Sequence, residues 1–249
     1  PHVVLACGGL GGLYKNSTNF PHISGDGLGI AMKHQVVLEH LDYIQIHPTT
    51  LYSRKPGRRF LISESVRGEG ALLYDKNGQR FTEELQPRDL LSKAIFAQME
   101  KDGTEFVWED MRPLGEETIM KHFPNIFKRC VEEGFDPRKE PIPVVPAQHY
   151  FMGGIKVDLG SRTSMKGLYA CGETSCNGVH GKNRLASNSL LESLVFARRA
   201  ADDIVFGDRP EKCPVNTIDT NIYEDRNVIL EGYHKMVWNE IERMKKSHE

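Results

Sequence analysis

The sequence predicts a mixed fold, α/β in one part and α+β in another, on the evidence of three stretches. Residues 2–7 form a near-continuous apolar run, typical of a strand buried on both faces, and a glycine turn follows at 8–12. Residues 167–171 form a short buried strand that leads through a polar loop into a helix. Between these stretches lie a hairpin turn at 75–78 and a helix opened by Pro87. Together they indicate α/β segments that flank an α+β region.

Composition narrows the class of protein. The chain has 249 residues, enough for one or two cores, and a net charge of −2, which gives no basic footprint for nucleic acid. No apolar run approaches the roughly 20 residues that a membrane helix needs, so no membrane contact is expected. The five cysteines are an odd number and indicate reduced thiols in the cytoplasm. Cys171 and Cys176 could be read as metal ligands, but without a second pair at zinc spacing buried thiols are favoured and no metal is expected.

The loop that follows residue 171 carries more chemistry than a turn requires. An ordinary connection between a strand and a helix needs only Gly, Asn or Ser, whereas several reactive side chains crowd this loop. They are Glu173, His180, Lys182, Asn183 and Arg184. Ser187, Asn188 and Ser189 are good N-caps for the next helix, whose apolar residues recur at helical spacing: Leu190, Leu191, Leu194, Val195, Ala201 and Ile204. A strand, a glycine loop and a helix N-terminus are suited to binding anions and phosphorylated cofactors.

The other elements follow from local signals in the first two thirds of the chain. Residues 24–27 are expected to cap a helix that runs to Met32, and residues 42–49 form a strand that Pro48 stops. The turn at 75–78 joins strands at 72–74 and 80–81. The helix after Pro87 has one apolar face and ends at Gly103; that face comprises Leu91, Ala94, Ile95 and Met99.

The last third of the chain contains short helices, a return segment and a final helix. Helices are expected at 116–122 and 124–133, followed by a stiff return marked by prolines 137, 141, 143 and 146 and a strand at 155–158. A final helix carries an apolar stripe with no visible partner in the sequence, made up of Leu230, Tyr233, Val237, Ile241 and Met244.

Five motifs together carry a resemblance to a known family. They are His-Pro-Thr at 47–49, LISESVRGEG at 61–70, Pro-Arg-Asp at 87–89, HYFMGG at 149–154 and HGKNRLASNSLLE at 180–192. The chain as far as about Gly207 resembles the flavoprotein family of succinate dehydrogenase and fumarate reductase. Ala186-Ser187 ahead of Asn-Ser-Leu-Leu-Glu is similar to the L-aspartate-oxidising branch, because the dehydrogenases usually carry Gly-Ala there.

The resemblance implies a particular domain organisation. Residues 1–46 and 152–207 would be two pieces of a partial FAD-binding Rossmann-like domain, 47–151 an inserted α+β capping domain, and 208–249 the start of a C-terminal helical region. The substrate is expected in the cleft between the two domains. The glycine turn at 8–12 is not the dinucleotide fingerprint, because Tyr14 stands where the third glycine belongs. We therefore expect these 249 residues alone to bind FAD weakly.

The resemblance also assigns roles to single residues, each with a plainer alternative. Arg88 would be the catalytic proton-transfer residue. The substrate-binding residues would be His47, Glu64, His149 and Arg184. The cofactor-binding residues would be Asp26, Glu173, Ser189 and Leu190. Asp26 is equally well explained as a helix cap, His47 as a structural histidine at a strand end, and Glu64 with Arg67 as a solvated charge cluster.

The implied reaction is the FAD-dependent oxidation of L-aspartate to iminoaspartate, with dioxygen or fumarate as acceptor, the first step of NAD biosynthesis through quinolinate. Arg184 would hold one carboxylate bidentately while the two histidines hydrogen-bond the other. An arginine base is chemically awkward because its pKa exceeds 12. Quinolinate synthase and a homo-oligomer through the C-terminal helix are the expected partners. The alternatives are a soluble fumarate reductase or succinate dehydrogenase flavoprotein, and a catalytically silent fragment that serves as a scaffold.

Overall fold

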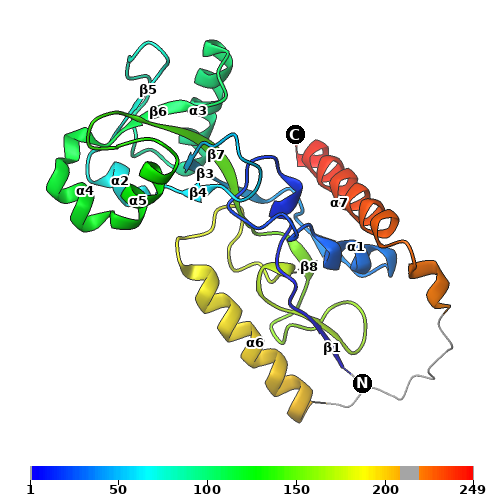
Figure 1. Cartoon of the computed structure of the whole chain (residues 1–249). Helices are drawn as coiled ribbons and strands as arrows, with labels where there is room; N and C mark the ends of the chain where they lie inside the picture. Colours follow the sequence, from blue (N-terminus) through cyan, green and yellow to red (C-terminus); the bar gives the residue numbers. More distant parts are fainter. Residues whose placement is uncertain (1, 208–218, 249) are drawn as a thin grey trace. The chain divides into compact units, whose positions relative to one another are not determined.

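The computed structural model describes residues 2–207 and 219–248, which form two compact units (Figure 1). The first unit contains residues 2–13, 21–45 and the described residues from 150 onward, and the second contains 14–20 and 46–149. Segment 14–20 belongs to the second unit because Thr18 N–H donates to Gln148 O at 2.9 Å and Gln148 N–H donates to Asn16 O at 2.9 Å. Cys213 lies outside the described residues.

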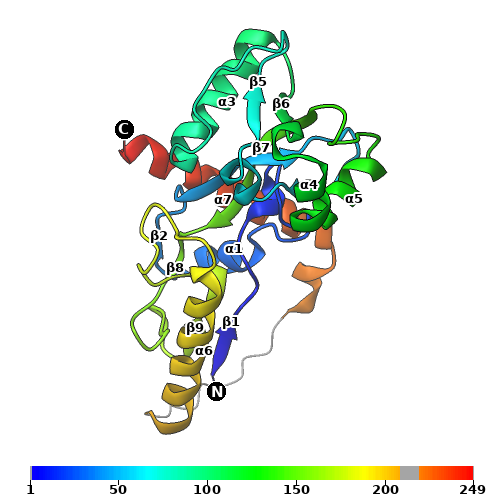
Figure 2. The same ribbon diagram turned by 90° about the vertical axis from the view of Figure 1, so that its left-hand side faces the viewer.

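Two small sheets organise the first unit (Figure 2). Strand β1 (Val3–Leu5) pairs in parallel with β9 (Leu168–Ala170). Strand β8 (Gly154–Lys156) lies between β10 (Ser175–Cys176), which is parallel to it, and β2 (Leu38–Glu39), which is antiparallel. Because β1 and β9 are parallel and in register, the glycine turn after β1 and the loop after β9 begin at the same edge. The short helices η1 (Gly11–Leu13) and η3 (Gly172–Thr174) lie in these two segments.

The expectation that the first strand is buried on both faces is wrong for this chain. Val3 and Val4 are 54% and 43% exposed. Among the described residues β1 pairs with β9 alone, so most of its apolar surface faces no neighbour. The prediction of a short buried strand at 167–171 is closer to the structure, because Tyr169 and Ala170 are buried.

The second unit is built on a five-stranded sheet with the order β4-β3-β7-β6-β5. Its strands are β3 (Ile44–Leu51), β4 (Phe60–Leu61), β5 (Leu72–Tyr74), β6 (Val107–Asp110) and β7 (Ile142–Phe151). The β3–β4, β5–β6 and β6–β7 pairs are antiparallel, with Leu73 opposite Glu109 and Glu109 opposite Ile142. Residues directly opposite each other on neighbouring strands point to the same face of the sheet, so these three residues share one face.

Helices pack an apolar core onto this sheet. They are α2 (Glu64–Gly68), α3 (Arg88–Asp102), α4 (Glu116–His122) and α5 (Pro124–Glu132), with the short η2 (Arg112–Leu114). The fully buried core side chains include Ile62, Val66, Leu73, Leu91, Ile95, Met111, Ile119, Cys130, Ile142 and Val144. Burying a side chain of this size stabilises the fold by about 1.5–3 kcal/mol, and the core is therefore the main source of stability of this unit.

Most of the helices and turns predicted from local sequence in the second unit are confirmed. Helix α3 begins directly after Pro87 and ends at Gly103, which adopts a left-handed conformation with φ 66°. The turn at 75–78 forms through Gly78 N–H donating to Asp75 O at 3.1 Å. Residues 80–81 do not form a full strand, because only the single bridge between Tyr74 and Arg80 continues the pairing.

Proline positions mislead in two places. The expected strand at 42–49 does not stop at Pro48, because β3 continues to Leu51. Strand β4 is only two residues long and pairs opposite Thr50 and Leu51, so Pro48 lies outside that ladder and its missing N–H costs no bond there. Pro143 and Pro146 likewise lie within β7, where a stiff return was expected.

Helix α6 (Asn188–Phe206) buries a different face from the expected one. Its buried residues are Glu192, Phe196 and Ala200. The apolar residues that suggested a core-facing stripe are largely exposed: Leu190 72%, Leu191 61% and Leu194 72%. Ser187 does precede the helix as expected, but it has a positive φ of 64° and its side chain makes no capping hydrogen bond.

The apolar stripe of the last helix, which has no visible partner in the sequence, is covered by a helix of its own unit. Helix α7 (Arg226–His248), which follows η4 (Thr220–Tyr223), packs against α1 (Asp26–Lys33). Val237 and Ile241 are fully buried, and a Cβ at Gly29 would lie 2.5 Å from the Cβ of Tyr233. The argument for association through this stripe therefore disappears. None of the described helices is both long and apolar enough to cross a membrane.

Candidate functional site

Two histidines lie side by side on neighbouring strands of the second unit. The rings of His47 on β3 and His149 on β7 have centroids 5.5 Å apart, and His149 Nδ1 lies 2.9 Å from Thr18 Oγ1. His47 Nε2 lies 2.8 Å from Ile62 O, and because a carbonyl oxygen only accepts, Nε2 donates. Adjacent strands therefore bring together two residues that are 102 positions apart in sequence.

His47 is a neutral imidazole in this environment. Burial lowers its pKa to about 3, and the neighbouring His149, Arg88 and Arg67 lower it further, while the hydrogen bond to Ile62 opposes the shift. With Nε2–H donated to Ile62, Nδ1 carries a lone pair and has no partner among the described residues. A carboxylate at Nδ1 would therefore need a proton on that nitrogen, so the expected hydrogen bond from His47 to a carboxylate requires proton uptake.

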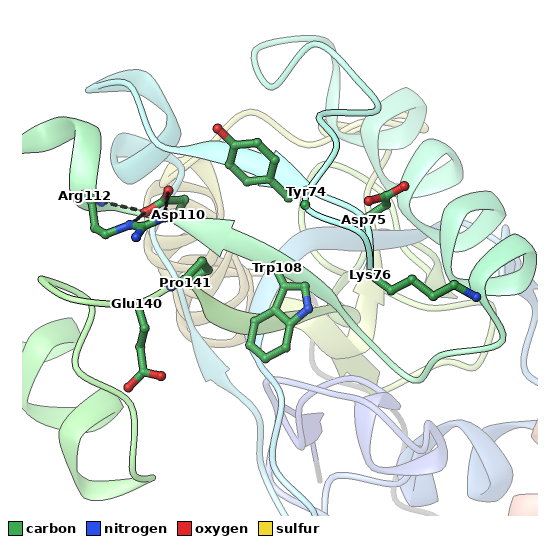
Figure 3. A pocket seen from close by; sticks show the side chains of 9 residues that line it. Tyr74, Asp75, Lys76, Trp108, Asp110, Arg112, Glu140 and Pro141 are labelled. Atoms are coloured by element: carbon green, nitrogen blue, oxygen red, sulfur yellow. Dashed lines mark hydrogen bonds and ion pairs between the residues drawn. The ribbon is translucent and has the colours of Figure 1, made fainter.

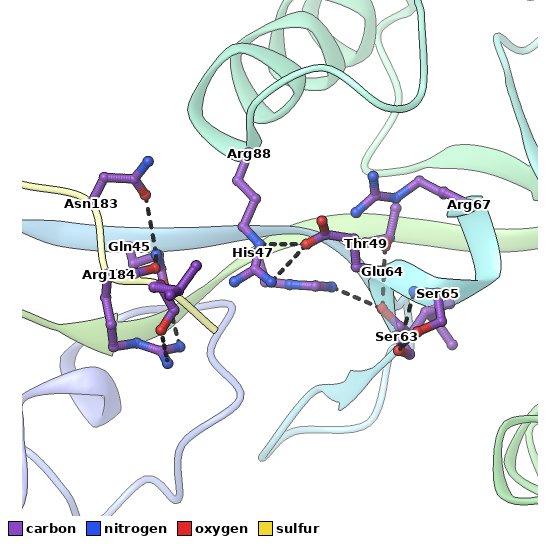
Figure 4. Close-up of polar contacts among 12 residues, drawn as sticks. Gln45, His47, Thr49, Ser63, Glu64, Ser65, Arg67, Arg88, Asn183 and Arg184 are labelled. Atoms are coloured by element: carbon purple, nitrogen blue, oxygen red, sulfur yellow. Dashed lines mark hydrogen bonds and ion pairs between the residues drawn. The ribbon is translucent and has the colours of Figure 1, made fainter. Parts of the chain in front are cut away.

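Arg88 and Glu64 form a close ion pair that the sequence did not predict, although it singled out both residues. Arg88 Nε and Nη2 lie 2.7 Å and 2.6 Å from Glu64 Oε2 (Figure 4). Arg88 opens α3 and Glu64 opens α2. An arginine at a helix N-terminus is unfavourable to the helix dipole, and the carboxylate of Glu64 offsets that cost.

Arg67 is not part of a solvated charge cluster, because it is 3% exposed. It lies on α2 one turn after Glu64, and its Nη1 donates to Glu84 O at 2.7 Å. Burial lowers the pKa of Arg67, and the carboxylates of Glu109, Glu64 and Glu84 oppose that shift. The second unit therefore holds an alternating set of charges around His47.

In the first unit, three contacts hold the guanidinium of Arg184. Its Nη2 donates to Gln45 Oε1 at 3.0 Å, and Gln45 Nε2 donates back to Arg184 O at 2.8 Å (Figure 4). The guanidinium carbon lies 4.4 Å from the ring centroid of Tyr150, and Arg184 Nη1 lies 3.4 Å from Ser189 Oγ. Sequence reasoning missed Gln45, which lies in none of the five motifs, and gave no role to Tyr150, although Tyr150 lies within the motif at 149–154.

Glu173 is a half-buried glutamate beside the glycine turn. Its Oε1 accepts from Phe151 N–H at 2.9 Å, and a Cβ at Gly9 would lie 2.7 Å from the same oxygen. Burial raises the pKa of Glu173 to about 7, against the hydrogen bond from Phe151 and the charge of Arg184. The glycine at position 9 is therefore required by Glu173, which explains part of the glycine-rich pattern.

The remaining cofactor candidates lie at helix N-termini. Asp26 is the first residue of α1, with its Oδ1 2.9 Å from Ser24 Oγ and 3.2 Å from His234 Nε2. Ser189 and Leu190 lie in the first turn of α6, and Leu190 N–H donates to Ser187 O at 3.2 Å. Asp26 thus has a structural role in joining α1 to α7, whatever else it binds.

Other glycines have packing roles within the chain. A Cβ at Gly153 would lie 2.0 Å from His40 O, and one at Gly154 would lie 2.5 Å from Thr174 O. These close backbone approaches explain the two glycines at the start of β8 without a ligand.

His180 is a further buried group in the loop before α6. Its ring makes an edge-to-face contact with Tyr150 at 5.6 Å, and its Nε2 lies 3.9 Å from Glu192 Oε2. Asn177 Nδ2 donates to Glu192. Burial lowers the pKa of His180 and raises that of Glu192. The sequence indicated His180 as unusual but not its partner, which lies twelve residues further along the chain on a helix face.

A surface cavity of about 490 Å³ lies elsewhere in the second unit (Figure 3). Its lining includes Tyr74, Trp108 and Glu140, together with Asp110 and Arg112, which bind each other. None of the candidate site residues lines it. Across residues 2–207 and 219–248, no group of three or more His, Cys, Asp or Glu could hold a metal ion. Cys171 and Cys176 are buried free thiols, as expected.

The first unit fits a flavin nucleotide by the chemistry of its donors. The glycine turn after β1, the loop after β9 and the N-terminus of α6 offer backbone N–H groups, and Glu173 supplies a half-buried acceptor beside the turn. Residues 1–190 match the protein family described as "FAD binding domain". The chain belongs to this family, and its cofactor is FAD.

The names of the curated relatives are more specific than the family description. The chain is 58% identical over 203 residues to L-aspartate oxidase of Clostridium perfringens, covering 81% of this chain and 46% of that protein. It is 49% identical over 242 residues to L-aspartate oxidase of Clostridium acetobutylicum, covering 94% of this chain and 56% of that protein. The chain thus spans about half the length of these relatives.

Solved structures share the fold. A quinol-fumarate reductase with menaquinol molecules is 34% identical with a TM-score of 0.75, covering 98% of this chain and 44% of that one. A quinol fumarate reductase from E. coli gives a TM-score of 0.74 at 34% identity, covering 96% and 43%. The mixed α/β fold and its membership among the succinate dehydrogenase and fumarate reductase flavoproteins are thereby confirmed.

Proposed function

We propose that the whole protein oxidises L-aspartate to iminoaspartate with FAD, passing the electrons to dioxygen or fumarate. The observation that supports L-aspartate as the substrate is the sequence identity of 58% and 49% to proteins named L-aspartate oxidase, against 34% to the fumarate reductases. The candidate residues support a dicarboxylate, because Arg88 and Arg184 are cations and His47 becomes one by taking up a proton. In this proposal the reaction is the first step of NAD biosynthesis through quinolinate.

Arg184 is proposed to bind one substrate carboxylate. Gln45, Tyr150 and Ser189 hold its guanidinium plane, so the side chain loses little further freedom when it binds a ligand. A planar guanidinium can form two parallel hydrogen bonds with a carboxylate. His47 and His149 are proposed to bind the other carboxylate, with His47 taking up the proton that Nδ1 needs.

Arg88 is proposed to transfer the proton with the help of Glu64. FAD, when bound, would supply the hydride acceptor for this oxidation. The substrate ammonium group must also lose a proton, and the carboxylate of Glu64, hydrogen-bonded to Arg88, is proposed as its acceptor. A guanidinium alone is a poor base, so the pair is better suited to the aspartate direction than Arg88 by itself.

Cofactor contacts are proposed for Glu173, Asp26 and the first turn of α6. Glu173 has a raised pKa, so it can hydrogen-bond either as an acid or as a carboxylate at neutral pH. Ser189 and Leu190 lie where a helix N-terminus favours a negatively charged group. We further propose a cytoplasmic location, which the free cysteines among the described residues support, and quinolinate synthase as the enzyme that uses the product.

The test is a substrate comparison with the full-length protein loaded with FAD. We expect oxidation of L-aspartate, with fumarate or dioxygen consumed in proportion, and little oxidation of succinate. Preferential oxidation of succinate would instead support a fumarate reductase or succinate dehydrogenase. Retained FAD without turnover of either substrate would support a scaffold role and overturn the proposal.

A further inference from the structure

A single carboxylate lies in the apolar core of the second unit. Glu109 on β6 has no exposed surface, and its register partners Leu73 and Ile142 are also fully buried. Val107, two residues earlier on the same face, and Met111, two residues later, belong to the apolar core. A charged or even a polar group at such a position is costly unless another group compensates it. A structural role in packing alone would be served better by an apolar residue.

Arg67 is the cation whose charge acts on Glu109, although no hydrogen bond and no ion pair within 4.0 Å joins the two side chains. Both carboxylate oxygens of Glu109 and two nitrogens of Arg67, Nε and Nη2, lack a hydrogen-bond partner among the described residues, and Arg67 is 3% exposed. Burial raises the pKa of Glu109 to about 7, and the charge of Arg67 opposes that rise. Burial lowers the pKa of Arg67, and Glu109 is the carboxylate that opposes this most strongly. The unsatisfied atoms thus belong to two residues of opposite charge that act on each other.

Two other titratable groups act on Glu109. Glu84 raises its pKa, but Arg80 already pairs with the Glu84 carboxylate at 2.6 Å and Leu73 N–H donates to it at 3.0 Å. Cys130 on α5 is fully buried, and its pKa is raised to about 12 by burial and by Glu109, so it stays a neutral thiol. Arg67 is therefore the one cation that acts on Glu109 among the described residues.

Arg67 connects this buried carboxylate to the candidate catalytic pair. Glu64 lies one turn before Arg67 on α2, and the two attract each other. Glu64 in turn receives two hydrogen-bond contacts from Arg88. The charges therefore alternate from the core outward in the order Glu109, Arg67, Glu64, Arg88.

We propose that Glu109 is a positioning residue: it is the buried counter-ion of Arg67 and thereby holds Glu64 in place for Arg88. With Glu109 ionised, the charge of Arg67 is compensated from the core side, and Glu64 is left to Arg88. Without Glu109, the uncompensated guanidinium of Arg67 draws Glu64 toward itself and away from Arg88. The consequence for turnover rests on the proposed function, whereas the interaction between the charges of Glu109 and Arg67 does not.

The first test is Glu109→Gln in the full-length protein loaded with FAD. We expect kcat for L-aspartate to fall by about tenfold or more, because a misplaced catalytic group is costly, with KM changed by less than about threefold. The loss in kcat should be larger above pH 7, where Glu109 is ionised in the unaltered protein, than below it, so the kcat–pH profile should change shape. Glu109→Asp should recover part of the loss. Unchanged kcat and pH profile in Glu109→Gln would overturn the positioning role.

The matched control is Asp110→Asn, at the neighbouring position on the same strand. Asp110 is also buried, but Arg112 binds it on the other face of the sheet. If Glu109→Gln acts only by loosening the sheet, Asp110→Asn should lower kcat to a similar extent, which would overturn the proposal. We expect it to change the melting temperature but not the shape of the kcat–pH profile.

Two further measurements test the pair without any substrate and cover the case in which Glu109→Gln does not fold. The double variant Arg67→Met, Glu109→Met should melt at a higher temperature than Glu109→Met alone, because it removes the stranded charge. Additive losses in the double variant would overturn the pairing. Infrared spectra should show a carboxylic acid C=O band that disappears near pH 7 in the unaltered protein and is missing in Glu109→Gln. These results hold even if L-aspartate proves not to be the substrate.

Discussion

Arg88 contacts one oxygen of Glu64 through two nitrogens, at 2.7 Å from Nε and 2.6 Å from Nη2. The two side chains come from the first turns of different helices, so both helices must be in place for the contact to form. Two contacts to one carboxylate oxygen hold the guanidinium in a defined position.

Arg88→Leu should abolish turnover of L-aspartate and leave the fold intact. The side chain of Arg88 is 20% exposed and contributes nothing to the apolar core, so its loss removes an ion pair and little packing. Circular dichroism and steady-state kinetics on the full-length protein check this. The control is Lys93→Ala, an exposed change on the same helix, which should leave both unaffected. An unfolded Arg88→Leu protein would indicate a structural role instead, and retained activity would exclude the proton-transfer role.

Arg184→Lys should raise KM for L-aspartate although the charge is kept. A lysine lacks the planar fork and cannot stack on Tyr150 while reaching Gln45. Losing a charged hydrogen bond costs about 1.5–3 kcal/mol, or roughly 10- to 100-fold in affinity. Arg199→Lys is a suitable control, because Arg199 also stacks on an aromatic ring, that of Phe196, at 5.0 Å and is exposed. A KM within about twofold of the unaltered protein would remove Arg184 from the binding site.

Dicarboxylate binding should take up a proton at His47. The pKa of free His47 is about 3, and a carboxylate at Nδ1 raises the pKa in the complex. Above pH 3 the complex therefore carries more protons at His47 than the free protein does. The affinity for the dicarboxylate falls as pH rises from about 3 to the pKa of His47 in the complex. Calorimetric titration with succinate in buffers of different ionisation heat measures this uptake. His122→Gln, an exposed histidine change in the same unit, should leave it unchanged. Equal heats in all buffers would contradict the prediction.

Glu173→Gln should change how stability depends on pH. Burial raises the pKa of folded Glu173 to about 7, above the ordinary value of 4.5. Between these values the folded state binds more protons than the unfolded state. The contribution of Glu173 to the free energy of unfolding is therefore fully present below pH 4.5 and is lost as pH rises through 7. The difference in melting temperature, Glu173→Gln minus unaltered protein, should therefore increase from pH 4.5 to pH 8. A constant difference would show that Glu173 titrates normally.

The 249 residues alone should retain little FAD. The glycine turn at 8–12 has Tyr14 where the dinucleotide fingerprint needs its third glycine, so the diphosphate contacts of that fingerprint are not supplied by these residues. The visible spectrum after incubation with excess FAD and desalting measures retention, with the full-length protein as the positive control. A stoichiometric flavin band from the 249 residues would show that Glu173, Asp26 and the start of α6 are sufficient.

Sequence by itself determined the family and most of the local elements. Helix α3 begins after Pro87 and ends at Gly103 because those residues restrict the backbone wherever they occur. The motifs around His47, Arg88, His149 and Arg184 indicated the flavoprotein family, which the match over residues 1–190 confirms. Their roles in catalysis and binding remain predictions.

Tertiary structure decided which residues meet and which faces are buried. The burial of Glu109 between Leu73 and Ile142 depends on strand register, and the stacking of Arg184 on Tyr150 depends on a long-range contact. Neither leaves a periodic signal along the chain. Leu190 and Leu194 are exposed although their spacing is that of a core stripe, whereas the stripe at Val237 and Ile241 is covered by α1. Apolar spacing reports that a face is suited to burial, but only packing partners, which can lie 200 residues away along the chain, determine whether it is buried.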